Sequence, residues 1–177
     1  MHSIDTLHEL LIDELQDLYF AETRLTKALP KFAKAATHPD LKSSFAVHLE
    51  QTHGHLTRLE DALKTLGTVA KGKTCHAMLG LIEEGEDAIA LKGPAPVRDA
   101  ALIGASQRVE HYEIAGYGTA RAFAECLGEH HVVELLKATL DEEAAADKKL
   151  TQLSRPVNAD ALAVDTGIHA GSTSKEA

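Results

Sequence analysis

Carboxylate side chains on helix faces that should be buried constrain this chain more than any other feature. Apolar residues recur at alternating steps of three and four residues along four stretches of about 25 residues each, which is the spacing of a buried stripe on an amphipathic helix. Glu22 lies on such a stripe, between Leu18 and Leu25. Removing an unpaired carboxylate from water costs several kcal/mol or forces it to take up a proton, so a buried cluster of carboxylates requires cations.

The other three stretches carry acidic residues or a histidine at the same depth. They are Glu50 and His53 on the second stretch, Glu110 and Glu113 on the third, and Glu143 and Asp147 on the last. Four helices that present oxygen or imidazole ligands at one depth are how a bundle builds a two-metal site in its core.

The second stretch contains the pattern Glu-x-x-His. His53 is central on the apolar stripe and Glu50 lies on its flank, and residues three apart share a helix face. In dimetal carboxylate bundles this pattern supplies two metal ligands from one helix. A four-residue pattern is weak alone, but its position at mid-helix, opposite the other acids, makes it informative.

Each of these residues has a simpler interpretation when it is taken alone. An acid on a stripe can reach solvent or pair with a base, and His53 can be a hydrogen-bonded core residue. Arg108 and Arg121 could each satisfy an acid by bidentate pairing, but two arginines cannot neutralise six carboxylates. The joint occurrence of six carboxylates and one imidazole therefore favours a metal centre over a metal-free helical scaffold.

The expected cofactors are two iron or manganese ions. Oxygen-rich coordination suits these metals better than structural zinc, which prefers cysteine and histidine ligands. Six carboxylates against the four positive charges of two divalent cations leave −2, whereas two trivalent cations give neutrality. This charge balance permits redox cycling.

Two tyrosines are candidates to orient the ligands. Tyr19 precedes Glu22 by three residues, and Tyr117 lies one turn after Glu113. By helical phase, the histidines expected at the surface are His48, His55, His130 and His131.

The expected fold is all-α, a ferritin-like four-helix bundle. Long helices are predicted over residues 4–36, 40–66, 97–127 and 129–153, with a kink at Pro30. Short connections make two antiparallel hairpins, and the long stretch 68–96, with a short extra helix at 77–91, is predicted to be a crossover between them. Residues 1–155 are expected to form the bundle, and residues 156–177 a flexible C-terminal tail.

Composition narrows the function classes. The 177 residues, of which 44% are hydrophobic, fit one domain, and the 4% of aromatic residues argues against a β-sandwich. A net charge of −9 without a basic stretch argues against nucleic-acid binding. The chain has no secretion signal, no membrane-spanning run, and two isolated cysteines, Cys75 and Cys126. We therefore expect a cytoplasmic protein that does not bind membranes.

Several longer runs resemble a known family, the YciF/YciE-type bacterial stress proteins of the ferritin-like superfamily. The resemblance spans about Leu7 to Leu153 and implies a ferritin-like bundle, a homodimer, a carboxylate-bridged dimetal centre and an association with stress responses. The runs that carry it are Ala21-Glu22, residues 29–31, 48–54, 80–84, 98–103 and 109–115.

The wider rubrerythrin-like pattern is matched by type and spacing at Glu22, Glu50, His53, Glu110, Glu113 and Glu143. In the last helix the pattern requires a histidine at position 146, where this chain has Ala146, and Asp147 is the nearest substitute. No rubredoxin-like cysteine module accompanies the bundle, so the resemblance implies an external electron donor.

The leading functional hypothesis is a dimetal oxidoreductase that acts on hydrogen peroxide or dioxygen. In this hypothesis Glu50 and Glu143 bridge the two metals, and the other predicted ligands are terminal. The alternative is a metal-binding or interaction protein of the stress response without turnover.

Overall fold

The computed structural model describes residues 3–165 of the 177-residue chain. Over these residues the protein is all-α. The helices are α1 (Leu7–Ala35), α2 (Pro39–Thr65), α3 (His76–Ala90), α4 (Ala95–Leu127) and α5 (His130–Asp165). None of the described helices is long and apolar enough to cross a membrane.

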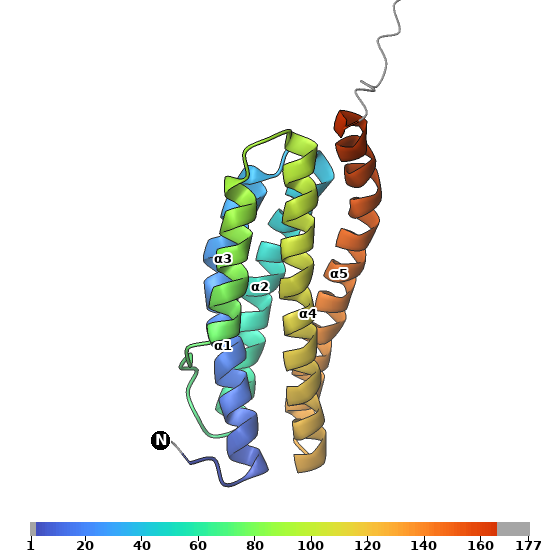
Figure 1. The fold of residues 1–177 in the computed structure, drawn as a ribbon. Helices are drawn as coiled ribbons and strands as arrows, with labels where there is room; N and C mark the ends of the chain where they lie inside the picture. Colours follow the sequence, from blue (N-terminus) through green and yellow to red (C-terminus); the bar gives the residue numbers. More distant parts are fainter. Residues whose placement is uncertain (1–2, 166–177) are drawn as a thin grey trace, which may run out of the picture.

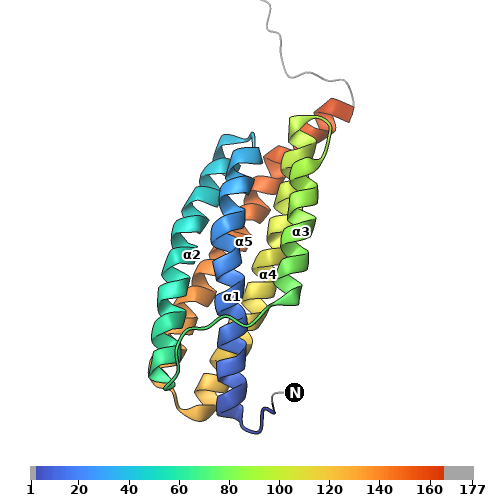
Figure 2. The ribbon, with the colours of Figure 1, turned by 90° about the vertical axis from the view of Figure 1, so that its left-hand side faces the viewer.

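The four long helices form two antiparallel hairpins, α1 with α2 and α4 with α5 (Figure 1). The connection from α2 to α3 crosses over α1 (Figure 2), where the amide of Lys73 donates to the carbonyl of Gln16 at 3.1 Å. The short helix α3 then packs against α1 and α4. The predicted four-helix bundle with a long crossover and a short extra helix is confirmed.

Local signals fix where the helices begin and end. Thr6 and Glu9 form a capping box at the start of α1, in which each side chain accepts a hydrogen bond from the other residue's backbone amide. Pro39 occupies the first turn of α2, where a missing amide hydrogen costs nothing. Gly128, with φ of 73°, ends α4 in the left-handed conformation that favours glycine.

The loop between α1 and α2 is attached to the other hairpin by one buried carboxylate. Asp99 near the start of α4 accepts hydrogen bonds from the amide of Thr37 at 2.9 Å, from the Thr37 hydroxyl at 2.6 Å and from the amide of His38 at 2.7 Å. These bonds hold the two hairpins together at one end of the bundle.

The last helix is longer than predicted. It continues past Leu153 and through Pro156 to Asp165, so residue 155, the predicted end of the bundle, lies within α5. Leu153 and Val157 are buried against the core, and this packing offsets the hydrogen bond that Pro156 removes. The rest of the predicted tail, residues 166–177, lies outside the described residues.

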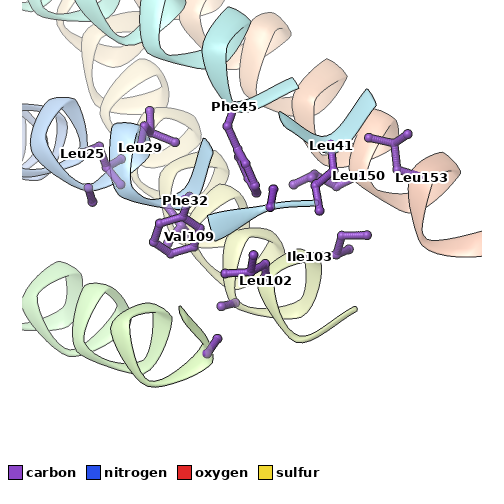
Figure 3. Packing of buried hydrophobic residues seen from close by; sticks show 14 of the residues in the cluster. Leu25, Leu29, Phe32, Leu41, Phe45, Leu102, Ile103, Val109, Leu150 and Leu153 are labelled. Carbon is purple, nitrogen blue, oxygen red and sulfur yellow. The ribbon is translucent and has the colours of Figure 1, made fainter. Parts of the chain in front are cut away.

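Two apolar clusters fill the described part of the bundle. The first packs around Phe32, Phe45 and Leu102 (Figure 3), and the second around Leu11, Leu59 and Leu136. Each of the four long helices contributes to both clusters, and between its two contributions each helix carries buried polar residues. The ligand candidates therefore lie in a polar layer between two hydrocarbon layers.

The approach of α3 to α1 gives a test of this packing. A Cβ atom on Gly85 would lie 2.3 Å from Cζ of Phe32, whose ring is buried against Phe45, whereas a Cβ on Gly80 would meet nothing within 4 Å. We expect Gly85→Ala to destabilise the fold by about 1–3 kcal/mol through overpacking. Gly80→Ala should stabilise it by about 0.5–1 kcal/mol, because glycine is a poor helix former. Urea denaturation measures both; equal effects would contradict the packing of α3.

Candidate metal centre

Each of the four long helices contributes to the polar layer. Glu22 of α1 and Glu143 of α5 are fully buried, as is Glu113 of α4, and Glu110 of α4 is 3% exposed. The second helix contributes two buried imidazoles, His48 and His55. The layer therefore contains four buried carboxylates and two buried imidazoles.

These side chains form two groups that share one member. His48, Glu110, Glu113 and Glu143 can each place a ligand atom within 4.8 Å of the others, and so can Glu22, His55 and Glu143. Glu143 belongs to both groups. A carboxylate with two oxygens in this position can bind one ion on each side, which is how a bridging ligand is placed in dimetal bundles.

Distances within the groups are short. His55 Nδ1 lies 3.1 Å from Glu22 Oε1 and 3.0 Å from Glu143 Oε1. On the other side, His48 Nε2 lies 3.5 Å from Glu110 Oε1 and 3.7 Å from Glu143 Oε2. Each imidazole is thus close to one terminal carboxylate and to the shared one.

Many of the polar atoms in the layer have no hydrogen-bond partner. Both carboxylate oxygens of Glu113 and both ring nitrogens of His48 are buried without one, as are Oε2 of Glu143 and one oxygen each of Glu22 and Glu110. Buried polar atoms are normally satisfied, because each unsatisfied one costs about 1–3 kcal/mol. Oxygen and imidazole donors suit iron or manganese, so these residues fit such ions.

The charges also balance. Four carboxylates against the four positive charges of two divalent cations give zero. The count of six carboxylates from the sequence, which left a charge of −2, included Glu50 and Asp147. The structure places these two residues outside the layer. Two divalent ions therefore neutralise the layer without a further group.

The contacts of His55 outside the layer are those expected of a metal ligand. Its Nε2 lies 2.9 Å from Glu142 Oε2, and Arg58 donates to both oxygens of Glu142 at 2.8 and 2.9 Å. Because a carboxylate accepts, Nε2 carries the hydrogen, which leaves Nδ1 for the metal side when the ring is neutral. A ligating histidine commonly donates its other N–H to a carboxylate in this way.

One of the two tyrosine candidates reaches the layer. The buried Tyr117 hydroxyl donates to Glu22 Oε1 at 2.6 Å. The Tyr19 hydroxyl donates instead to Glu60 at 3.0 Å, on the exposed side of the hairpin. Tyr117 therefore orients a carboxylate of the layer and Tyr19 does not.

Without cations, protons must compensate for the buried charges. Burial raises the pKa of Glu22, and it raises the pKa values of Glu110 and Glu113 well above their ordinary value, with the nearby carboxylates adding to the shift of the latter two. Although burial lowers the pKa of His55, hydrogen bonds and charges from Glu143 and Glu22 raise it to about 10. Burial acts to raise the pKa of Glu143, but His55 and His48 outweigh it and lower that pKa.

The prediction that Glu50 and His53 lie on the buried face of the second helix is wrong. Both are exposed. The buried stripe of α2 advances by alternating steps of four and three and contains two histidines and a threonine. It runs through Leu41, Phe45, His48, Thr52, His55, Leu59 and Ala62. This stripe can be found in the sequence only if histidine and threonine are allowed at buried positions. Leu49 and Leu56 instead suggested that a different face of the helix is buried.

For the same reason the prediction that His48 and His55 lie at the surface is wrong, although His130 and His131 are exposed as expected. His55 ends a Thr52-x-x-His55 pattern, in which threonine stands where the usual pattern has glutamate. His48 supplies the second imidazole of the layer. The rubrerythrin-like pattern would place this imidazole at position 146, where the chain has alanine.

Asp147 lies at the edge of the bundle and outside both groups. Its side chain is 23% exposed, accepts a hydrogen bond from Gln107 at 3.0 Å and lies 3.2 Å from His111 Nε2. The buried stripe of α5 passes through Thr139, Glu143 and Leu150, which places position 147 one residue out of phase. Arg121, considered above as a partner for the acids, lies 3.2 Å from Glu125.

The total inventory nevertheless matches that of ferritin-like dimetal sites. These use one glutamate from each of two helices and a Glu-x-x-His pattern from each of the other two, which gives four carboxylates and two imidazoles. The present layer has the same numbers, but both imidazoles come from α2 and α4 supplies two carboxylates. The fold and the layer together define a ferritin-like protein with a candidate dimetal centre.

Comparison with known proteins assigns the family. Residues 6–163 match the family described as a domain of unknown function, DUF892, and the chain belongs to that family. It is 45% identical to Protein YciF of Escherichia coli (strain K12) over 153 residues, which cover 86% of this chain and 92% of that protein.

Solved structures agree with this assignment. The crystal structure of the E. coli stress protein YciF matches with a TM-score of 0.84 and 44% identity, over 87% of this chain and 98% of that chain. YcfI from Rhodopseudomonas palustris matches with a TM-score of 0.82 and 43% identity, over 85% and 96%. A ferritin-like diiron-carboxylate protein from Bacillus anthracis, 16% identical, shares the fold with a TM-score of 0.67, over 86% and 100%.

The pKa shifts predict that the metal-free protein loses stability as the pH rises from about 6 to 8. The pKa of His55 is raised from 6.5 to about 10, so the folded state keeps a proton there that the unfolded state releases in this window. The pKa values of Glu110 and Glu113 are raised well above 4.5, which acts in the same direction. The folded state thus binds more protons in this window, so the free energy of unfolding falls as the pH rises.

Urea denaturation of chelator-treated protein at the two pH values measures this effect. The stabilisation added by bound metal should follow the opposite trend, because metal ligands must be deprotonated. If the urea concentration at the unfolding midpoint of the metal-free protein rises with pH, the carboxylates of the layer are solvated rather than buried.

Proposed function

We propose that this protein is a dimetal oxidoreductase of the stress response, which binds two iron or manganese ions in the polar layer and acts on hydrogen peroxide or dioxygen. The observation that carries the proposal is the position of Glu143, which is shared by two buried groups of ligands. The naming of the E. coli relative as a stress protein supports the physiological context.

His48, Glu110 and Glu113 would hold one ion, Glu22 and His55 would hold the other, and Glu143 would lie between them. When bound, a pair of ions that alternates between the divalent and trivalent states supplies the two electrons that convert hydrogen peroxide and two protons to two water molecules. The exposed Glu50 and His53, and Asp147 at the edge of the bundle, have no part in this arrangement.

The remaining residues position the ligands and exclude water. Tyr117 fixes the orientation of Glu22, and the pair formed by Glu142 and Arg58 fixes His55. The two apolar clusters close the layer from both ends and keep the local dielectric low. In such an environment the negative charges of the carboxylates must be compensated by bound cations or protons. The ligands are thus held in place by rigid helices before an ion binds.

The resemblance to YciF/YciE-type proteins extends the proposal to a cytoplasmic homodimer. Because the chain has two cysteines and no Cys-x-x-Cys pattern, electrons for repeated turnover would come from another protein. Peroxide or dioxygen consumption should therefore depend on an added reductant as well as on bound metal.

The test compares Glu113→Gln with Glu50→Gln. Glu113→Gln keeps the shape of the side chain but removes one negative ligand, so we expect it to lower the affinity for at least one ion by about 10–100-fold or more. Metal-dependent consumption of peroxide or dioxygen should fall in parallel, while Glu50→Gln keeps both ions and the wild-type rate because Glu50 is exposed. Elemental analysis and a peroxide or oxygen electrode provide the measurements.

A stability measurement separates loss of a ligand from misfolding. In the metal-free protein, Glu113→Gln should leave the melting temperature unchanged or raise it, because burial and three neighbouring carboxylates oppose the charged form of Glu113. Two ions bound as tightly by Glu113→Gln as by the wild type would contradict the ligand assignment. Full metal content without turnover would favour a metal-binding stress protein that is not an enzyme.

A further inference from the structure

A small cavity lies beside the polar layer, between α1, α2, α3 and α4. Its volume is ≈ 20 Å³. Most of its wall is hydrocarbon, and His48, Ser106 and Glu110 form its polar part. The apolar residues of the wall are Leu25, Ala28, Leu29, Phe32, Ile82 and Val109.

The wall is built from packed helix faces. Figure 3 shows Leu25, Leu29 and Phe32 in one cluster with Val109 of α4. On the α3 side, the half-buried Ile82 lines the cavity, and Gly85 allows α3 to lie against the Phe32 ring. The cavity therefore extends from beneath α3 to His48 and Glu110.

The volume limits the occupant to a very small molecule. One water molecule needs about 10–15 Å³ on the same measure. A cavity of ≈ 20 Å³ can hold a diatomic molecule but no organic substrate of ordinary size without rearrangement.

The wall also selects by polarity. Hydrogen peroxide has two hydroxyl groups, and burying them without hydrogen bonds is costly. The Ser106 hydroxyl already donates to the carbonyl of Leu102 at 2.8 Å, and His48 and Glu110 each offer one atom to the ligand groups. The six hydrocarbon side chains favour a neutral molecule that makes no hydrogen bonds.

We propose that this cavity binds dioxygen and delivers it to the His48 and Glu110 side of the layer. The delivery step rests on the proposed function, whereas binding in the cavity is a property of the chain itself. If two divalent ions are bound there, dioxygen would take up one electron from each ion and two protons from two water molecules, and hydrogen peroxide and two hydroxide ions would be released. Dioxygen, rather than peroxide, is the oxidant that this route serves.

The first experiment uses the metal-free protein, methyl-labelled for NMR, under dioxygen and under nitrogen. Dioxygen is paramagnetic, so it speeds the relaxation of nearby methyl groups. We expect a stronger effect on the buried Leu25, Leu29 and Val109 than on buried methyl groups of the second cluster, such as Leu59 and Leu63. Equal relaxation of the two sets would overturn the proposal.

A matched pair of variants locates the effect. Ala28→Val adds two carbons to the cavity wall, and Ala33→Val makes the same change on α1 outside the wall. We expect Ala28→Val to reduce the extra relaxation to the level of the second cluster and Ala33→Val to leave it unchanged. Extra relaxation that persists in a folded Ala28→Val protein would place dioxygen elsewhere and overturn the proposal.

The metal-loaded protein then separates this inference from the proposed function. With iron(II) bound, Ala28→Val should slow oxidation by dioxygen by about tenfold or more while the rate with added peroxide stays close to that of the wild type. Cavity relaxation without any metal-dependent reaction would refute the delivery step and the oxidoreductase, but not the dioxygen site. Equal slowing with both oxidants would show that the variant disturbs the ligands and would refute the selective route.

Discussion

Burial of four carboxylates in one layer of a helical bundle is the constraint on which the rest of this structure depends. Glu22, Glu110, Glu113 and Glu143 lie between two hydrocarbon clusters, and no lysine or arginine is paired with them among the described residues. Without cations, the layer is compensated by protons on the acids and by a charged His55. Two divalent ions would replace those protons and satisfy the unpartnered oxygens, so metal binding and stability are linked.

The four long helices hold this layer in place because each is apolar on both sides of it. Side chains of the first cluster fix α1 and α4 on one side, those of the second cluster fix them on the other, and the ligands between them have little freedom to move. Outside the layer, Arg58 and Glu142 hold His55 from the surface of α2 and α5. The crossover helix α3 adds a wall on the α1 and α4 side, where the small apolar cavity forms.

The sequence was sufficient for the fold and for the buried glutamates of α1, α4 and α5. Glu22 stands out because Leu18 and Leu25 flank it on its stripe, and the stripes of Glu110 and Glu143 are set by apolar residues further along each helix, such as Ile103, Leu136 and Leu150. In α2 the phase is ambiguous, since Leu49, Leu56 and Leu63 form a stripe that competes with the one containing His48 and His55. Histidine and threonine are polar in isolation, and only their contacts with the other helices show which stripe is buried.

A single-residue error in phase also explains Asp147. Adjacent positions on a helix differ by about 100° in direction, so Asp147 points to the edge of the bundle while Ala146 lies closer to the line of Glu143 and Leu150. A residue pattern can therefore give the depth of a ligand along a helix more reliably than its direction. The inventory of four carboxylates and two imidazoles emerges only when the four faces are brought together.

Anomalous diffraction from crystals grown with manganese(II) tests the central claim most directly. The account predicts two peaks on opposite sides of the Glu143 carboxylate, one next to His48 Nε2 and the other next to His55 Nδ1. A layer without anomalous density at saturating manganese, or peaks at the exposed Glu50 and His53 instead, would contradict it.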